Sequence, residues 1–454
     1  MFPNQFSDSL WGDEAFSAIL SQKPLGEMIK IVAHDTSPPL YYLIEHYWFK
    51  LVGNSEVAIR SLSFLFHLGT VMAVFLLAKF LWDKRTALWA AILGFLNPFL
   101  FTYAFEGRMY TLLAFTTTLS FYGYFRAFYG STTKNIKWKL FYALAVAMAL
   151  YSHHFALFAI LVQGVWLLPL LIREVLKPRS LKKIFSLTWP FLLITGLYLP
   201  WLPALYYQTM LVKGGFWLAK PIMINLLELI GKFLIGSQAY PLRTLTLTIV
   251  VMLFLWRRWQ IKDKVDGILV SWFLLPLVFT WLISQITQSI FFDRYLLFTI
   301  PALALLLASQ RRTLVSSFIL VLLIIIFTAL NWNYFTHPHK RPFKAMASYL
   351  NQEVKPTDAL MNWNSAAHHL WESQYYGLAA PIYSPTGPLP FYVGTAQMTK
   401  EDVISTPPSN QRIGVITSGP VEEVQLSNYK QDEIRQFGNL KVIWLKKLNR
   451  QSTQ

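Results

Sequence analysis

Apolar and polar positions alternate in long blocks along most of this chain. Between residues 62 and 334, ten apolar stretches recur, most of them near the ~20 residues that a helix needs to cross the hydrocarbon core of a bilayer. The pattern therefore predicts a polytopic α-helical membrane protein with about ten spans. The predicted spans are 62–81, 86–104, 109–128, 139–152, 154–172, 184–203, 240–256, 267–286, 294–309 and 313–334.

Two further stretches are apolar without being expected to span. After Pro38 and Pro39, apolar residues recur at helical spacing over 40–51, which is typical of an amphipathic helix at the membrane interface. The stretch 222–236 is interrupted by Glu228 and Lys232, so we expect it to be interfacial or re-entrant.

The pattern changes at about residue 336, where Pro, Asn, Gln, Asp and Glu become frequent. The runs RIGVITS and LKVIWLKK read as strands and FKAMASYLNQEV reads as a helix, which together predict a small α/β domain. The sequence thus predicts three parts. They are a first extracytoplasmic loop at 1–61, a transmembrane bundle at 62–335 with a long outer loop at 204–239, and an extracytoplasmic α/β domain at 336–454.

Composition supports a membrane protein. Apolar residues make up 54% of the chain and charged residues 14%, whereas soluble proteins carry about 25% charged residues. The chain has no cysteine, which excludes disulfides, thiolate metal sites and cysteine nucleophiles. Its amino end shows neither the basic region nor the apolar region of a cleavable signal peptide.

The net charge of +17 reflects basic residues placed between the apolar stretches. Alternate connecting segments, from 82–85 to 310–312, hold 16 Lys and Arg against 4 acidic residues, whereas the opposite set is almost uncharged. By the positive-inside rule the basic segments face the cytoplasm. The segment 1–61, the 204–239 loop and the carboxyl-terminal domain then face outward. Short loops and the lack of an endoplasmic-reticulum retrieval signal favour a bacterial plasma membrane.

The polar residues capable of chemistry gather on this outer side. A carboxylate can act as a general base on an acceptor hydroxyl, while Arg and Lys can hold a phosphate and stabilise it as a leaving group. The spans themselves show almost no charge, which counts against an ion-coupled transporter. These features predict an outer-face enzyme for an amphiphilic phosphate substrate. The candidate residues are Asp13, Glu14, His34, Asp35, Arg108, Tyr110, Lys213, Lys220, Arg294 and Tyr295.

Structural roles remain open for several of these residues. Asp13 and Glu14 can serve as helix caps, and Asp35 can cap the helix that follows Pro38 and Pro39. Arg294 can be an interfacial anchor paired with Asp293.

Lys213 and Lys220 flank a glycine pair, Gly214 and Gly215, and can either clamp a phosphate when the loop closes or belong to a solvated loop. Adjacent His153 and His154 lack the spacing of a metal site on one helix face, so no metal site and no certain cofactor is predicted, and a divalent metal ion stays open as a cofactor.

Four motifs carry a resemblance to a known family. WGDEAFS, HDTSPPLYYLIEHYWFKLVGNSEVAIRSLS, FEGRMYTLL and FFDRYLLFTIPALALLL occur in this order between residue 8 and about 310. Together they resemble the GT-C glycosyltransferases of the protein O-mannosyltransferase and aminoarabinose-transferase (ArnT-like) type. The resemblance implies a polyprenyl-phosphate-linked sugar as donor and transfer with inversion to an extracytoplasmic acceptor.

The same resemblance assigns roles by motif. It implies that Asp13 is the catalytic base with Glu14 as its partner, and that His34 and Asp35 contact donor sugar or acceptor. Arg108 and Tyr110 match an Arg-x-Tyr pattern, and Arg294 and Tyr295 match residues that meet the carrier phosphate. Lys213 and Lys220 are added as substrate-binding candidates.

The chain departs from this family at its start. Relatives carry a transmembrane helix directly before the Asp-Glu pair, whereas Asp13 here follows Met1 by twelve residues. We therefore expect either an upstream start site or a truncated paralogue. Two other function classes stay open at this point, a lipid-linked-sugar flippase or transporter and a non-catalytic scaffold that presents the tail domain. The sugar, and whether the acceptor is a glycan, a lipid or a protein, are not specified by the sequence.

Overall fold

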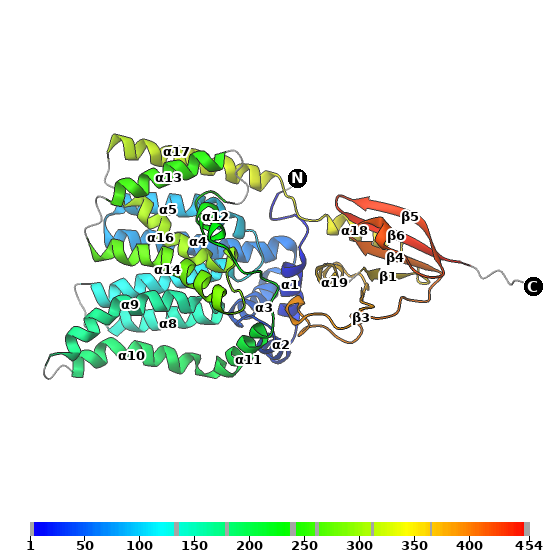
Figure 1. Cartoon of the computed structure of the whole chain (residues 1–454), viewed down its shortest axis with the longest axis horizontal. Coiled ribbons are helices and arrows are strands. Elements are labelled where there is room, and N and C mark those ends of the chain that lie inside the picture. The colour runs from blue at the N-terminus through cyan, green and yellow to red at the C-terminus, as the bar shows by residue number, and fades with distance from the viewer. Residues whose placement is uncertain are drawn as a thin grey trace, which may run out of the picture. The chain divides into compact units, whose positions relative to one another are not determined.

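The computed structural model describes residues 4–130, 136–177, 181–236, 242–258, 263–309, 313–363 and 366–448. The chain divides into two compact units. We call the unit made of Thr36–Tyr41 and Arg60–Thr336 the helical unit, and the unit made of Met1–Asp35, Tyr42–Ile59 and His337–Gln454 the α/β unit (Figure 1). The amino-terminal segment therefore belongs to the same compact unit as the carboxyl-terminal domain.

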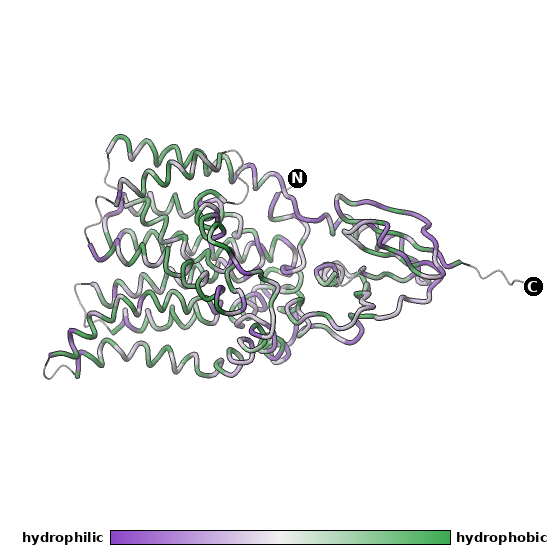
Figure 2. The backbone as a smooth tube through the Cα atoms, in the orientation of Figure 1, coloured by the Kyte–Doolittle hydropathy of each residue, from purple (hydrophilic) through white to green (hydrophobic). Residues whose placement is uncertain are grey.

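The helical unit is built from apolar helices, and Figure 2 shows hydrophobic positions along most of their length. Its helices in chain order are α4 (Glu56–Leu81, whose first turn lies in the α/β unit), α5 (Lys84–Leu96), α6 (Pro98–Tyr103), α7 (Tyr110–Tyr124), α8 (Ile136–Ser152), α9 (Ala156–Val175), α10 (Leu181–Tyr198), α11 (Leu202–Lys213), α12 (Met223–Ile235), α13 (Leu242–Arg258), α14 (Lys264–Ile286), α15 (Asp293–Leu296), α16 (Ile300–Ala308) and α17 (Leu314–Thr336).

The described part of every predicted span falls largely on these helices and on the short π or 3-10 turns that continue them, but the number of ten is not established. Residues 240–241 of the span 240–256 lie outside the described residues. Among the described residues, five helical segments are long and apolar enough to cross a membrane. They are Glu56–Leu81, Ala156–Val175, Leu181–Lys213, Lys264–Ile286 and Leu314–Thr336. The predicted basic segment 310–312 lies outside the described residues.

The predicted span 86–104 shows why the count differs. It is divided between α5 and α6 because Pro98 has no N–H to continue the helical ladder. Asn97 occupies the break: its Oδ1 accepts the N–H of Leu100 at 2.9 Å, and its Nδ2 donates to the carbonyl of Phe233 in α12 at 2.7 Å. The break is thus a capped helix start rather than a continuous span.

The segment 204–239, predicted as an outer loop, is largely helical. A 3-10 turn at Leu199–Trp201 joins α10 to α11. The apolar helical segment that starts with α10 therefore continues to Lys213. Within the stretch 222–236, residues Met223–Ile235 form α12. The residues 237–239 lie outside the described part of the chain.

The segment 1–61, predicted as a loop, is also mostly helical. It contains α1 (Gly12–Gln22), α2 (Leu25–His34), α3 (Leu40–Val52) and the start of α4. Acidic Asp13 and Glu14 fall in the first turn of α1, where the helix dipole favours negative charge. The helix predicted over 40–51 is confirmed as α3.

The carboxyl-terminal part of the α/β unit is the predicted α/β domain. Its helices are α18 (Phe343–Glu353) and α19 (Ala367–Tyr375). Its strands are β1 (Ala359–Asn362), β2 (Ile382–Tyr383), β3 (Val403–Ile404), β4 (Arg412–Thr417), β5 (Tyr429–Phe437) and β6 (Leu440–Lys447). The strands predicted from RIGVITS and LKVIWLKK are β4 and β6, and the helix predicted from FKAMASYLNQEV is α18.

One mixed sheet of order β3-β2-β1-β4-β6-β5 organises this domain (Figure 1). The first four strands are parallel neighbours, and β6 runs antiparallel to both β4 and β5. Alternate residues of the strands point to opposite faces, so two separate apolar clusters form. One contains α18 with Leu360, Ile416 and Trp444, and the other contains Met361, Val415 and Ile443.

Candidate functional sites

Asp13 and Glu14 lie where the start of α1 packs on α19. Gly12 permits this close approach, because a Cβ there would lie only 2.7 Å from the Cα of His368. The sequence motif WGDE therefore needs its glycine to bring the two acidic residues against the carboxyl-terminal domain.

Asp13 is the more accessible of the two carboxylates. Its side chain is 28% exposed, and its Oδ1 lies 3.9 Å from Nδ1 of His368. The ring of His368 in turn stacks on Trp11, with the ring centroids 5.9 Å apart. An accessible carboxylate beside an imidazole has the chemistry of a general base.

Glu14 is placed differently from its neighbour. Its side chain is fully buried and forms an ion pair with Nζ of Lys340 at 2.7 Å. Glu14 also accepts the N–H of Trp11 at 3.4 Å, in the manner of a helix-capping carboxylate. Its charge is therefore compensated inside the fold, which favours a structural role beside Asp13.

A third carboxyl group at this place, Glu372 of α19, was not predicted from the sequence. Its side chain is fully buried, and neither of its oxygens has a hydrogen-bond partner among the described residues. Burial, with the nearby charges of Asp13 and Glu14, raises the pKa of Glu372 to about 8. A single Glu within the stretch AHHLWESQY carries no sequence signal for this, because its burial depends on the packing of α1 against α19.

His34 and Asp35 end α2. His34 is exposed, and its Nδ1 lies 2.8 Å from the carbonyl of Lys30. Asp35 is buried and occupies the C-cap position of α2, five residues before α3 begins. It therefore does not occupy the N-cap position of the helix after Pro38 and Pro39.

Arg294 and Arg108 come together with Tyr110 in the helical unit. Nη1 of Arg294 lies 3.4 Å from Oε1 of Glu106, and its guanidinium lies 5.6 Å from the ring centre of Tyr110. Asp293, the anchor partner considered for Arg294, instead forms an ion pair with Lys232 of α12 at 3.0 Å. Arg294 thus faces Glu106 and the ring of Tyr110.

A cavity of about 290 Å³ lies within the helical unit. One part of its wall is polar and includes Arg108, Tyr110 and Tyr295. Another part is apolar, from α9, α11 and the segments beside them. Apolar residues of this part include Phe155, Leu157, Phe158, Leu205, Val212 and Phe216. A cavity with cationic and apolar walls suits a molecule that is part phosphate and part hydrocarbon.

His153 and His154 also line this cavity, between α8 and α9. Nε2 of His154 lies 2.7 Å from Oε1 of Gln208, and the amide of Gln208 donates to the carbonyl of Ser37 at 3.3 Å. Within the described part of the chain, no group of three or more His, Asp and Glu side chains is arranged to hold a metal ion.

Lys213 and Lys220 lie at the ends of the 213–220 segment and do not line the cavity. Both are exposed, and Nζ of Lys220 donates to the carbonyl of Gln285 at 3.3 Å. Gly215 between them has a φ of +139°, a backbone conformation that side-chain-bearing residues rarely adopt.

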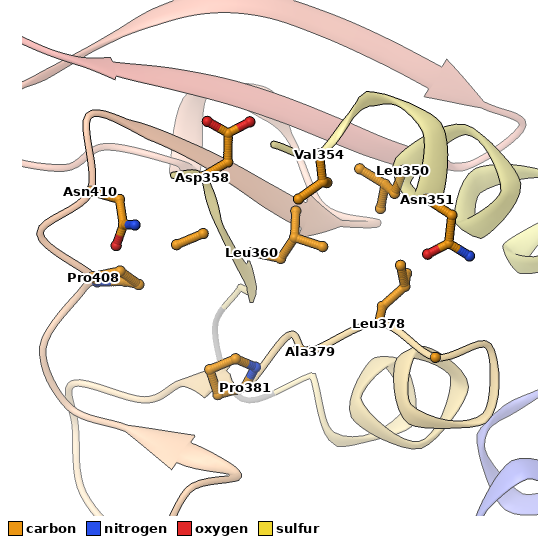
Figure 3. Close-up of a pocket in the computed structure, with 12 residues that line it drawn as sticks. Leu350, Asn351, Val354, Asp358, Leu360, Leu378, Ala379, Pro381, Pro408 and Asn410 are labelled. Atoms are coloured by element: carbon orange, nitrogen blue, oxygen red, sulfur yellow. The ribbon is translucent and has the colours of Figure 1, made fainter. Parts of the chain in front are cut away.

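The α/β unit contains a separate cavity of about 570 Å³ between α18, β1 and the segment around Asn410. Figure 3 shows Asn410 at one end and Asn351 at the other, with Leu360 between them. Asp358 lines it as well, but its Oδ2 lies 3.3 Å from Nη1 of Arg412. None of the predicted site residues borders this cavity.

His67 is an ionisable residue inside the predicted span 62–81 and was not weighed against the transporter alternative. His67 lies in α4, is fully buried, and has its Nε2 3.2 Å from the carbonyl of Phe95. This contact gives the ring a structural partner in α5, so His67 does not restore the argument for an ion-coupled transporter.

Comparisons with known proteins place these features in context. Residues 36–207 match the family model described as dolichyl-phosphate-mannose-protein mannosyltransferase. This range includes Arg108, Tyr110 and the two adjacent histidines. No curated protein matches the sequence significantly.

Solved structures share the fold over nearly the whole chain. ArnT from Cupriavidus metallidurans in the apo state has a TM-score of 0.67 at 13% identity, and the match covers 97% of this chain and 95% of that chain. The same protein bound to undecaprenyl phosphate has a TM-score of 0.65 at 12% identity, with the same coverage. The oligosaccharyltransferase from Archaeoglobus fulgidus in complex with Zn and sulfate has a TM-score of 0.55 at 13% identity, covering 90% of this chain and 64% of that chain.

The resemblance indicated by the four sequence motifs is therefore confirmed: residues 36–207 match the mannosyltransferase family model, and the chain has the fold of the ArnT-like GT-C glycosyltransferases.

Proposed function

We propose that this protein is an integral-membrane glycosyltransferase that moves a monosaccharide from a polyprenyl-phosphate carrier to an acceptor outside the cytoplasm. The observation that carries the proposal is the cavity of the helical unit, whose wall combines Arg108 with the apolar side chains of α9 and α11. A lipid-borne phosphate has the matching chemistry, an anionic head on an aliphatic chain.

The comparisons support this substrate class. The family model that matches residues 36–207 is named for a dolichyl-phosphate-linked mannose donor, and one of the structures that share the fold is bound to undecaprenyl phosphate. Both compounds are polyprenyl monophosphates. The sugar and the acceptor are not specified by this likeness.

In the proposed reaction Asp13 takes the proton from an acceptor hydroxyl. The acceptor oxygen then forms a bond to the anomeric carbon as the bond between that carbon and the carrier phosphate breaks, so the anomeric configuration inverts. Arg108 and Arg294 stabilise the charge that develops on the leaving phosphate, because a guanidinium binds phosphate through two hydrogen bonds. Glu14 supports the turn that carries Asp13.

The remaining candidates have binding roles in this proposal. Tyr110 and Tyr295 line the phosphate end of the cavity, and His34 and Asp35 contact the donor sugar or the acceptor. Lys213 and Lys220 draw the anionic carrier toward the membrane surface, since both are exposed cations. The excess of Lys and Arg in alternate connecting segments supports an outward orientation of Asp13 and of the carboxyl-terminal domain.

The test is the thermal stability of the detergent-purified protein with undecaprenyl phosphate or with undecaprenol, which lacks the phosphate. A ligand at 100 times its dissociation constant stabilises the folded state by about 2.7 kcal/mol. We expect stabilisation by undecaprenyl phosphate in the wild type, little stabilisation by undecaprenol, and loss of the difference in Arg108→Ala. Equal stabilisation by the two lipids would contradict a phosphate site.

Lys177→Ala provides a matched control. It removes an exposed cation of a predicted cytoplasmic segment, where Lys177 pairs with Glu174 at 2.8 Å. This variant should keep the full difference between the two lipids. A loss as large as that of Arg108→Ala would show that overall charge, rather than the cavity, explains the effect.

A further inference from the structure

Glu372 has no assigned role in the proposed reaction, yet it lies at the contact between α1 and α19. Its carboxyl group is fully removed from solvent, and neither oxygen accepts a hydrogen bond of good geometry among the described residues, although the N–H of Gly12 lies nearby. Glu372 belongs to α19, whereas Asp13 and Glu14 belong to the first turn of α1, which packs against it.

The charged and titratable groups around Glu372 come from three segments. Asp13 and Glu14 of α1 are acidic, and Glu14 is already paired with Lys340. Arg341, just before α18, is the cation that acts on Glu372, and the N–H of Gly12 also favours its ionised form. On α19 itself His368 faces Asp13, and burial lowers the pKa of His369 to about 3, so that ring is neutral.

A carboxyl group in such surroundings is favoured in its neutral form. Its ionised form would be a buried charge that forms no ion pair among the described residues, close to two other negative charges. The cation and the backbone dipole do not compensate for these effects, and the pKa of Glu372 is raised to about 8, chiefly by burial.

We propose that Glu372 is a positioning residue for Asp13: its neutral carboxyl allows the first turn of α1 to pack on α19, and loss of its proton to solvent displaces that turn. The inference rests on the proposed function, in which Asp13 is the base. A displacement on the order of 1 Å at a reacting group costs about 100-fold in rate, so the position of this turn matters for turnover. The site would therefore lose activity as pH rises through the pKa of Glu372.

The protonation of Glu372 can be measured without a substrate. The unfolded chain releases this proton above the ordinary pKa of 4.5, whereas the folded chain keeps it until about pH 8. Between these values the unfolded state binds fewer protons, so the free energy of unfolding falls as pH rises. Glu372→Gln removes this loss, because the amide has nearly the same shape and does not ionise.

We therefore expect the melting temperature of Glu372→Gln to exceed that of the wild type by an amount that grows between pH 5 and pH 8. Glu422→Gln makes the same chemical change at an exposed position and should follow the wild type at every pH. A difference between Glu372→Gln and the wild type that is constant with pH would overturn the inference.

The second measurement is the pH profile of turnover, followed as release of undecaprenyl phosphate from synthetic undecaprenyl-phosphate monosaccharides. In the wild type we expect activity to fall about tenfold for each pH unit above pH 8, and in Glu372→Gln this alkaline fall should disappear. A merely structural role would change the rate at all pH values alike. An unchanged alkaline fall in Glu372→Gln would overturn the positioning role.

The two arms also separate the inference from the proposed function. If the wild type releases no undecaprenyl phosphate from any donor, the proposed function fails and the positioning role fails with it, while the melting curves still decide whether Glu372 holds a proton. If the wild type is active and its pH profile of turnover coincides with that of Glu372→Gln, the proposed function stands and the inference about Glu372 is wrong.

Discussion

Asp13 and Glu14 are neighbours in the sequence, but their side chains have different surroundings. Asp13 is 28% exposed, whereas Glu14 is fully buried and paired with Lys340. Replacing Glu14 by Gln breaks its ion pair with Lys340 at a fully buried carboxylate, and breaking a buried pair costs ~3 kcal/mol or more. We predict that Glu14→Gln lowers the melting temperature by several degrees.

The same substitution at Asp13 provides the comparison. Asp13→Asn removes an accessible carboxylate that lies 3.9 Å from His368, so its melting temperature should stay close to that of the wild type. Equal losses of stability in the two variants would mean that both carboxylates serve the fold.

At the residue scale the sequence predicted the members of the sites better than their contacts. The motifs identify Arg108, Tyr110 and Tyr295, and the structure places all three on one cavity. The partner of Arg294 was not predictable, because Glu106 is 188 positions away and reaches it only through helix packing. Glu372 was missed for the same reason.

At the element scale, the approach of α1 to α19 depends on one glycine. A Cβ at position 12 would lie 2.7 Å from the backbone of His368, which cannot move without shifting α19. Overpacking of this kind costs about 1–3 kcal/mol. We predict that Gly12→Ala lowers both the melting temperature and the turnover.

Gly26 of α2 is the matched control for this substitution. A Cβ there meets no atom within 4 Å, and alanine is the better helix former. Gly26→Ala should leave turnover unchanged and should not lower the melting temperature. If the two variants behave alike, the contact between α1 and α19 does not position Asp13.

Element types were predictable where the apolar period was long and uninterrupted, as in α9, α14 and α17. The errors lie at breaks and in mixed segments. Asn97 and Pro98 divide one predicted span into α5 and α6, although the apolar run continues through them. The segments 1–61 and 204–239 were predicted as outer loops, and both contain helices of which the sequence predicted the one over 40–51, because tertiary contacts stabilise the others.

At the scale of the whole molecule, the proposed function requires a defined orientation in the membrane. The chain has no cysteine, so a single introduced cysteine can be labelled without background. We predict that a membrane-impermeant maleimide labels cysteine at position 213 or 422 in intact cells, and labels cysteine at position 177 only after permeabilisation. These positions carry exposed Lys213, Glu422 and Lys177. Labelling of position 177 in intact cells would reverse the proposed orientation.

The class of the whole molecule followed from its apolar blocks, and the fold shared with ArnT over 97% of the chain agrees with it. Its division into units did not follow from the sequence. One compact unit contains residues 1–35, 42–59 and 337–454. Contacts between segments that are about 300 positions apart produce no periodic pattern in a single sequence, so the division could not be predicted from it.

The central claim, glycosyl transfer with Asp13 as base, is tested most directly by turnover of the purified protein. Synthetic undecaprenyl-phosphate monosaccharides are incubated with the wild type and with Asp13→Asn, and the release of undecaprenyl phosphate is followed by mass spectrometry. Removing the general base should lower the rate at least ~100-fold, since such groups typically contribute 10²–10⁴-fold. Release by the wild type that is lost in Asp13→Asn is the predicted result. Release at the wild-type rate in a folded Asp13→Asn protein would contradict the account.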